Sequence, residues 1–282
     1  MKKVPGRKTD VSDAEWLASL ARAGLLRGSF VPPAKLRDLR LVSRQRQKLS
    51  GQLSAEKNRL GKVLSDAGVR LGVVVSDLHG KSARAMTKAI VLGATPEAAL
   101  AHASKQLKAS PVEIKAALDG ELTEAHRFVA GEILGHIEAL ETRLARFDAY
   151  LVDALDTPRE RNALALLQTM PGIGLIGAAM PLVEACPPPS RGQAPVRTGI
   201  GSGMTAFQSP QALASWAGLC PGNNESAGKR KSAKSRKGNP YVRRLLCEFA
   251  NCAVKTASAF RAKFKGPNLK ALSSARGANE RS

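Results

Sequence analysis

Apolar residues at helical spacing dominate the first half of this chain and constrain its fold most strongly. Over residues 36–67 they recur at intervals of three, four and seven, with Arg, Lys and Gln between them: Leu36, Leu39, Val42, Leu49, Leu53, Leu60 and Val63. This period matches one face of an α-helix and leaves a basic, solvated opposite face. The sequence therefore predicts one long amphipathic helix over this range.

A second apolar pattern, over residues 133–151, has the alternating steps of four and three that define a heptad seam. Its members are Ile133, Ile137, Leu140, Leu144, Phe147 and Leu151, with Glu138, Glu141, Arg143 and Arg146 at flanking positions. A seam of about three heptads is the shortest that indicates a coiled coil. An intermolecular coiled coil and a helix packed inside its own domain are therefore both open, and the first would make the protein a homo-oligomer.

Shorter helices are predicted around these two. Residues 13–27 indicate a helix that ends near Gly24, and the SFVPP that follows cannot be helical because of its paired prolines. TPEAALAHASKQLK and SPVEIKAALDG each begin with a Ser or Thr cap before proline. Residues 185–203 are rich in Pro and Gly and indicate an insert, and residues 266–282 indicate a polar tail. We therefore expect a mainly α protein.

The charge of the chain indicates a polyanionic partner. Its 282 residues contain 44 Lys and Arg against 23 Asp and Glu, a formal charge of +21, and no requirement of folding explains this excess. From residue 156 to the end there are nineteen basic and six acidic residues, which places the polyanion site in the C-terminal part. Nucleic acid is the favoured partner because neutralised phosphates release counterions.

An anionic membrane surface is the rival partner, and the sequence does not support it. No apolar run approaches the roughly 20 residues that span a bilayer, and the N-terminus MKKVPGRKTD has no hydrophobic segment typical of a signal peptide. The four cysteines form no CxxC pair and the four histidines are scattered, so no zinc site is expected. We expect a soluble, intracellular protein.

The sharpest local motif is LLQTMPGIGLIGAAM, over residues 166–180, which resembles a helix-hairpin-helix. Gly172 and Gly174 allow the turn to expose backbone N–H groups, and the helix that follows adds its positive N-terminal end. Such a turn can hold a phosphate without reading base sequence. The alternative is an ordinary connection between two helices, and the basic surroundings favour phosphate binding.

A basic loop follows a helix that begins at Ser209-Pro210 and ends at Gly218. The loop presents Ser226 beside Gly228 and then a dense basic run, interleaved with Gly and Ser instead of Glu. The residues that can follow a phosphate backbone are Lys229, Arg230, Lys231, Lys234, Arg236, Lys237, Arg243 and Arg244. A charge run is usually a solvated face, and here the absence of acids favours a nucleic-acid contact. By itself Ser226 is a loop serine, since no His or Asp with triad-like placement accompanies it.

Two carboxylates, Asp10 and Asp13, lie three residues apart at the start of the first helix, on one face. The simpler interpretation is capping, with Asp10 as the N-cap and Asp13 in the first turn. Two carboxylates at this spacing could also bind Mg²⁺, which usually takes one or two carboxylates plus phosphate oxygens from a substrate.

Together these motifs resemble the DEDD-type insertion-sequence transposases of the IS110 and IS1111 groups. The resemblance rests on VPGRKTDVSDAEWLASL with GLLRGSFVPP, SDLHGKSARAM, TMPGIGLIGAA and ALASWAGLCPGNNESAGKRKSAKSRKGNPYVRRLL. It covers most of residues 1–265. It implies a remnant of an RNase-H-like domain over 1–35, a helical or coiled-coil region over 36–156, and a small helical transposase domain with the helix-hairpin-helix over 157–265.

The resemblance also implies a chemistry. Members are DNA recombinases that use Mg²⁺ and, in characterised members, a structured guide RNA. By position, Asp10 and Asp13 match the last two acids of the DEDD set, and Ser226 matches the serine that forms a covalent link with DNA. The implied location is the bacterial cytoplasm, in association with the nucleoid.

Three departures from the family pattern accompany this resemblance. The first Asp and the Glu of the DEDD set would lie upstream of Asp10, where this chain has only nine residues. Residues 185–203 look inserted, and the chain ends in a tail where the family continues with helix. We therefore expect a truncated, inactive copy. The alternative is a non-catalytic nucleic-acid-binding protein that uses the hairpin and the basic loop without chemistry.

Overall fold

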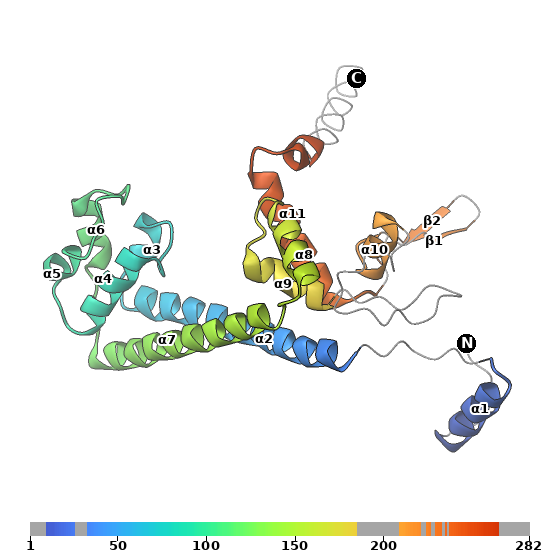
Figure 1. Ribbon diagram of the computed structural model, residues 1–282. Coiled ribbons are helices and arrows are strands. Elements are labelled where there is room, and N and C mark those ends of the chain that lie inside the picture. The colour runs from blue at the N-terminus through green and yellow to red at the C-terminus, as the bar shows by residue number, and fades with distance from the viewer. Residues whose placement is uncertain are drawn as a thin grey trace.

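Two long helices form the axis of the molecule and run antiparallel to each other (Figure 1). α2 spans Ala34–Asp66 and α7 spans Glu124–Asp153, so the long helix predicted over 36–67 is confirmed. The computed structural model describes residues 10–25, 33–184, 209–220, 224–226, 229–232, 235 and 237–264. The insert expected at 185–203 and the tail expected at 266–282 lie outside these residues.

The heptad seam of α7 is buried against α2 of the same chain. Three clusters along the pair join them: Ile133 and Ile137 with Leu60 and Leu64, Leu140 and Leu144 with Leu49, and Leu151 with Leu36 and Leu39. Apolar side chains at this spacing form one continuous stripe, and α2 supplies the matching stripe. The seam therefore packs inside its own domain, and association of several copies through it stays a prediction.

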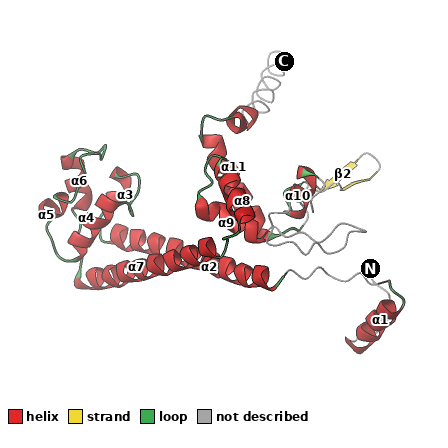
Figure 2. Cartoon of the chain, viewed as in Figure 1, coloured by secondary structure: helices red, strands yellow, loops and turns green. Residues whose placement is uncertain are grey.

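A head of four short helices connects the far ends of α2 and α7, and Figure 2 shows that helices and loops alone build it. The helices are α3 (Leu71–Val74), α4 (Lys81–Val91), α5 (Pro96–Leu100) and α6 (Pro111–Leu118). Thr95 caps α5, and Ser110 forms a capping box with Glu113 on α6; a proline follows each cap. Both of these predicted helix starts are confirmed.

The C-terminal helices pack on the opposite end of the long pair. α8 (Pro158–Gln168) and α9 (Leu175–Glu184) share a buried core with Leu36, Leu39 and Leu151, and α11 (Pro240–Lys255) lies against α9. α10 spans Pro210–Trp216, with Ser209 as its N-cap; Gly218, whose φ is 77°, follows the C-cap Ala217, in agreement with the helix start and stop that the sequence predicts. Within the described residues, β1 (Asn224–Ser226) and β2 (Lys229–Ser232) are the only strands. The mainly α fold is confirmed.

α1 spans Asp10–Arg22 and contributes no residue to a buried core. It begins three residues before the predicted helix, so Asp10 lies in its first turn together with Asp13 and is not its N-cap. The helix dipole favours both carboxylates there. Among the residues described, no helix is both long and apolar enough to cross a bilayer.

Candidate nucleic-acid interface

Ser226 lies at the end of β1, where the sequence alone indicated only a polar loop. β1 and β2 pair antiparallel, with the Cα of Ser226 opposite Lys229 and that of Glu225 opposite Arg230. A register shift lies between Asn224 and Glu225. Three residue pairs join the two strands, in a segment whose Gly- and Ser-rich composition indicated a loop. The pairing brings the backbone of Ser226 next to the start of the basic run.

The predicted basic residues that the structure describes fall into two groups, one on β2 and one around the start of α11. Lys229, Arg230 and Lys231 lie on β2, and Lys234 and Arg236 lie outside the described residues. Lys237, Arg243 and Arg244 are exposed just before and along the first turns of α11. Arg244 Nε donates to Glu248 Oε1 at 2.8 Å on the same helix, whereas no ion pair among the described residues involves Arg243. Lys237, Arg243 and Arg244 thus present basic side chains to solvent around the start of α11, and Lys229, Arg230 and Lys231 precede them in the chain on β2.

The start of α11 is held in place by Asn239. Its Oδ1 accepts from Tyr241 N at 3.0 Å and Val242 N at 3.2 Å, so Asn239 caps the helix. Its Nδ2 donates to Glu184 Oε2 at 3.1 Å. Pro240 follows the cap at the first position of the helix, where its missing N–H has no cost.

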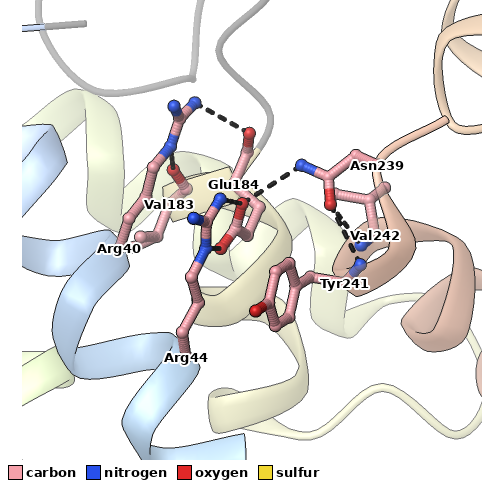
Figure 3. Close-up of polar contacts among 7 residues, drawn as sticks. All are labelled: Arg40, Arg44, Val183, Glu184, Asn239, Tyr241 and Val242. Atoms are coloured by element: carbon pink, nitrogen blue, oxygen red, sulfur yellow. Dashed lines mark hydrogen bonds and ion pairs between the residues drawn. The ribbon is translucent and has the colours of Figure 1, made fainter.

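Glu184 is a buried carboxylate at the end of α9, with a side chain only 1% exposed. Arg44 on α2 donates to it twice, from Nε to Oε1 at 2.8 Å and from Nη2 to Oε2 at 3.0 Å (Figure 3). With the bond from Asn239, this carboxylate accepts three hydrogen bonds from two elements. The bonds to Glu184 raise the pKa of the Arg44 guanidinium above its ordinary value. A buried charge is tolerated because it is paired in this way.

Two further contacts reinforce this junction. Arg40 donates from Nε to Val183 O at 3.1 Å and from Nη2 to Glu184 O at 3.0 Å, and so binds carbonyl groups at the C-terminal end of α9. The Arg44 guanidinium lies 4.6 Å from the centre of the Tyr241 ring, within cation–π range. α2, α9 and α11 therefore meet in one polar junction (Figure 3).

The Pro-Gly-Ile-Gly turn between α8 and α9 faces the other end of α11. Gly172 has φ 84°, and a Cβ atom there would lie 2.3 Å from Cys252 Cβ. Gly174 has open space around its Cα. Gly172 is therefore required by close packing on α11, whereas a side chain at Gly174 would meet no heavy atom within 4 Å of its Cβ.

The turn and the basic hairpin are separated along α11. Cys252 packs beside the turn, while Asn239 caps the opposite end of the same helix. Thirteen residues of α-helix correspond to ~20 Å. The two segments predicted to bind phosphate are thus held apart by one rigid helix, so a single phosphate cannot bridge them.

The two predicted metal ligands lie on α1. Figure 1 draws this helix apart from the β1–β2 hairpin, so the structure does not bring Asp10 and Asp13 next to Ser226. Two carboxylates in one helical turn meet part of what Mg²⁺ needs, the rest being oxygens of a substrate or further acids. No group of three or more His, Cys, Asp or Glu side chains suited to a metal is found among the described residues. The described residues alone do not complete a metal site.

Sequence reasoning missed Glu184, Asn239 and Arg44. Asn239-Pro240 does have the pattern of a helix start, so the capping role of Asn239 could have been predicted. Arg44 belongs to the basic side of a long helix, where most Arg residues are solvated. Its pairing with Glu184 joins positions 140 residues apart, and no spacing rule links them.

Two family models match this chain. One, described as a transposase of the IS116/IS110/IS902 family, matches residues 164–265. The other, a transposase model of the DEDD type of IS110, matches residues 1–68. Together they span more than half of the chain and include α1, the Pro-Gly-Ile-Gly turn, the β1–β2 hairpin and α11. A search of curated proteins found no match.

Proposed function

Because this chain belongs to the IS116/IS110/IS902 family of transposases, we propose that it is a DNA recombinase in which Ser226 attacks a DNA phosphodiester. One observation carries the proposal: the matched range 164–265 contains the hairpin in which Ser226 stands opposite Lys229. The backbone register puts a serine and a cation at the same end of a two-stranded ribbon. Phosphoryl transfer needs a nucleophile and positive charge at one phosphate.

The proposed step is an exchange of phosphate esters. Ser226 Oγ forms a bond to phosphorus, the bond from phosphorus to one bridging sugar oxygen breaks, and that oxygen leaves as a hydroxyl with the proton that the serine loses. The serine hydroxyl is a weak nucleophile, so its reaction depends on charge near the phosphate. In this proposal the basic residues on β2 supply part of this charge, and the backbone pairing of Lys229 with Ser226 supports that role.

Contacts with the DNA backbone extend beyond the hairpin in this proposal. They use the two groups of basic residues and the turn, namely Lys229, Arg230, Lys231, Lys234, Arg236, Lys237, Arg243, Arg244, Gly172 and Gly174. Gly174 contributes through backbone N–H groups beside the start of α9, and Gly172 acts by shaping the turn. A structured guide RNA offers the same phosphates, so this surface fits both nucleic acids. Such binding would associate the protein with the nucleoid.

A divalent metal is part of the family's chemistry, and we propose Mg²⁺ with Asp10 and Asp13 as two of its ligands. The metal would neutralise charge on the reacting phosphate when bound. Further acids would have to join these two, whether from a residue outside the described ranges or from another copy of the chain. Assembly of several copies is the remaining part of the proposal.

The covalent step is tested by trapping protein on DNA. We expect DNA carrying the element's end, incubated with the full chain, Mg²⁺ and guide RNA, to yield a protein–DNA adduct that survives a denaturing gel. Ser226→Ala should abolish the adduct, and the matched control Ser232→Ala, on the other strand of the hairpin, should leave it. An adduct that persists in Ser226→Ala rejects the assigned nucleophile. Salt-sensitive binding without any adduct from the unmodified chain would instead favour the inactive copy that the departures from the family pattern indicated, or a non-catalytic nucleic-acid-binding protein.

The DNA contact is tested by the salt dependence of affinity. Changing Lys229, Arg230 and Lys231 together to Ala should reduce the slope of log affinity against log salt by about 2 to 3. As a control of equal charge, Lys62, Lys105 and Lys108 are exposed on the helix pair and the head, and their replacement by Ala should change the slope little. Equal effects of the two triple changes would show that the hairpin is not the phosphate site.

A further inference from the structure

The β1–β2 hairpin belongs to a stretch of chain whose two ends meet beside α10. Gly238 lies so close to the end of α10 that a Cβ atom there would be 2.3 Å from Gly218 N and 2.6 Å from Trp216 O. The next residue, Asn239, donates its backbone N–H to Trp216 O at 3.4 Å. The stretch that leaves α10 after Gly218 therefore returns to the same point. Asn239 lies at the point where this stretch meets the end of α10 again.

The Asn239 side chain forms hydrogen bonds of two kinds, one that caps α11 and one that links it to Glu184. Its Oδ1 caps α11 by accepting from Tyr241 N and Val242 N, and its Nδ2 donates to Glu184. A cap needs only the oxygen, and Asp or Ser would serve as well. The amide nitrogen is therefore needed only for the link to Glu184.

Glu184 in turn fixes the link to the rest of the molecule. Its carboxylate is buried and is bound by both Nε and Nη2 of Arg44 on α2. Charged hydrogen bonds are directional, and a buried carboxylate oxygen that lacks a hydrogen-bond donor costs folding free energy. The junction therefore holds Asn239 in one position relative to α2, where apolar packing alone would permit sliding.

We propose that Asn239 is a positioning residue for the Ser226 hairpin, which ties the closing point of that stretch to Glu184 and, through Glu184, to Arg44 on α2. This inference rests on the proposed role of Ser226. In this proposal α2 holds the closing point of the stretch at a fixed position relative to the long helix pair, and so positions the Ser226 hairpin. Asn239 does not touch the reacting atoms in this role.

Two substitutions separate the link from the cap. Asn239→Asp keeps an oxygen for the cap but sets a second carboxylate against Glu184, so the link breaks by repulsion while α11 stays capped. The double change Glu184→Gln with Asn239→Asp exchanges amide and carboxylate. It restores a donor–acceptor pair between the two positions and returns the net charge to that of the unmodified chain. Because Glu184 Oε2 also accepts from Arg44 Nη2, this variant loses one bond to Arg44 and should recover in part.

Amide hydrogen exchange of the full chain gives the first measurement. In Asn239→Asp we expect exchange over 224–232 to rise about tenfold, while exchange over 240–255 stays within about twofold and shows that α11 is still folded. The exchanged pair should return the hairpin to within about threefold of the unmodified chain. Unchanged hairpin exchange in Asn239→Asp would overturn the proposal, and recovery in the exchanged pair would support it.

Adduct formation gives the second measurement. At saturating DNA, Asn239→Asp should form the Ser226 adduct at least about tenfold more slowly, with DNA affinity and its salt slope unchanged, and the exchanged pair should recover part of the rate. A loss of affinity with an unchanged rate at saturation would reject a positioning role. If the unmodified chain forms no adduct, the proposed function fails on that result, and the exchange data still decide whether Asn239 holds the hairpin.

Discussion

Two glycines of one turn differ in what surrounds them. The Cα of Gly172 lies against α11, where a Cβ atom would be 2.3 Å from Cys252 Cβ and 3.3 Å from its Sγ, and the residue has φ 84°. Gly174 has no heavy atom within 4 Å of the position of a Cβ and no left-handed backbone. Composition treats the two as equivalent, and only the packing of α11 distinguishes them.

We expect Gly172→Ala to lower the free energy of unfolding by about 2 kcal/mol or more, because both backbone strain and overlap with Cys252 oppose it. Gly174→Ala should change it by less than about 1 kcal/mol. Urea denaturation of the two variants measures the difference. Equal losses would show that α11 does not pack on the turn as described.

At the scale of elements, a charge cluster joins the long pair to the head. Glu141 on α7 accepts two bonds of 2.7 Å from Arg84 on α4, and Lys57 on α2 lies 3.3 Å away. The bonds from Arg84 are the main cause that lowers the pKa of Glu141 to about 2, and Lys57 adds to them. The same bonds raise the pKa of Arg84. Three helices are thus held by one carboxylate.

This cluster predicts a loss of stability in acid. The pKa of Glu141 is about 2 in the folded chain and near 4.5 without its partners, so its contribution is complete above about pH 4.5 and is lost as the pH falls toward 2. The contribution should be about 1 to 2 kcal/mol, because the side chain is 33% exposed and solvent screens it. Glu141→Gln should remove this part of the pH dependence.

A matched control uses Glu132, which is exposed on the same helix. Glu132→Gln should leave the pH profile of the urea midpoint close to that of the unmodified chain. The assignment fails if the two variants lose the same part of the profile between pH 5 and 2.

At the scale of the whole molecule, one pair of helices serves two cores. Its far end shares the core of the head with Met86 and Ile90, and its near end shares a core with α8 and α9 (Figure 1). Ile137 lies on this pair with none of its surface exposed. The packing of α2 on α7 therefore stabilises both cores within a single copy of the chain.

We expect Ile137→Ala to cost about 2 to 4 kcal/mol of unfolding free energy, since it leaves a cavity between α7 and α2. Leu92→Ala removes apolar surface from a side chain that is 87% exposed, and it should cost less than about 0.5 kcal/mol. The Tm of the unmodified chain should not depend on protein concentration if its seam is filled by α2. A Tm that rises strongly with concentration would show that this seam also binds a second copy.

The sequence by itself predicted the two long helices and the helix starts at Thr95, Ser110 and Ser209, because the period of apolar residues and the caps act over a few residues. It also located the basic stretch and Ser226, since charge and motif are written in order along the chain. The tertiary structure alone decided that the 133–151 seam packs on α2, that Gly172 packs on Cys252, and that Arg44, Glu184 and Asn239 meet. The physical reason is sequence separation: these contacts join positions far apart in the chain, and each depends on how whole helices pack, which no local pattern specifies.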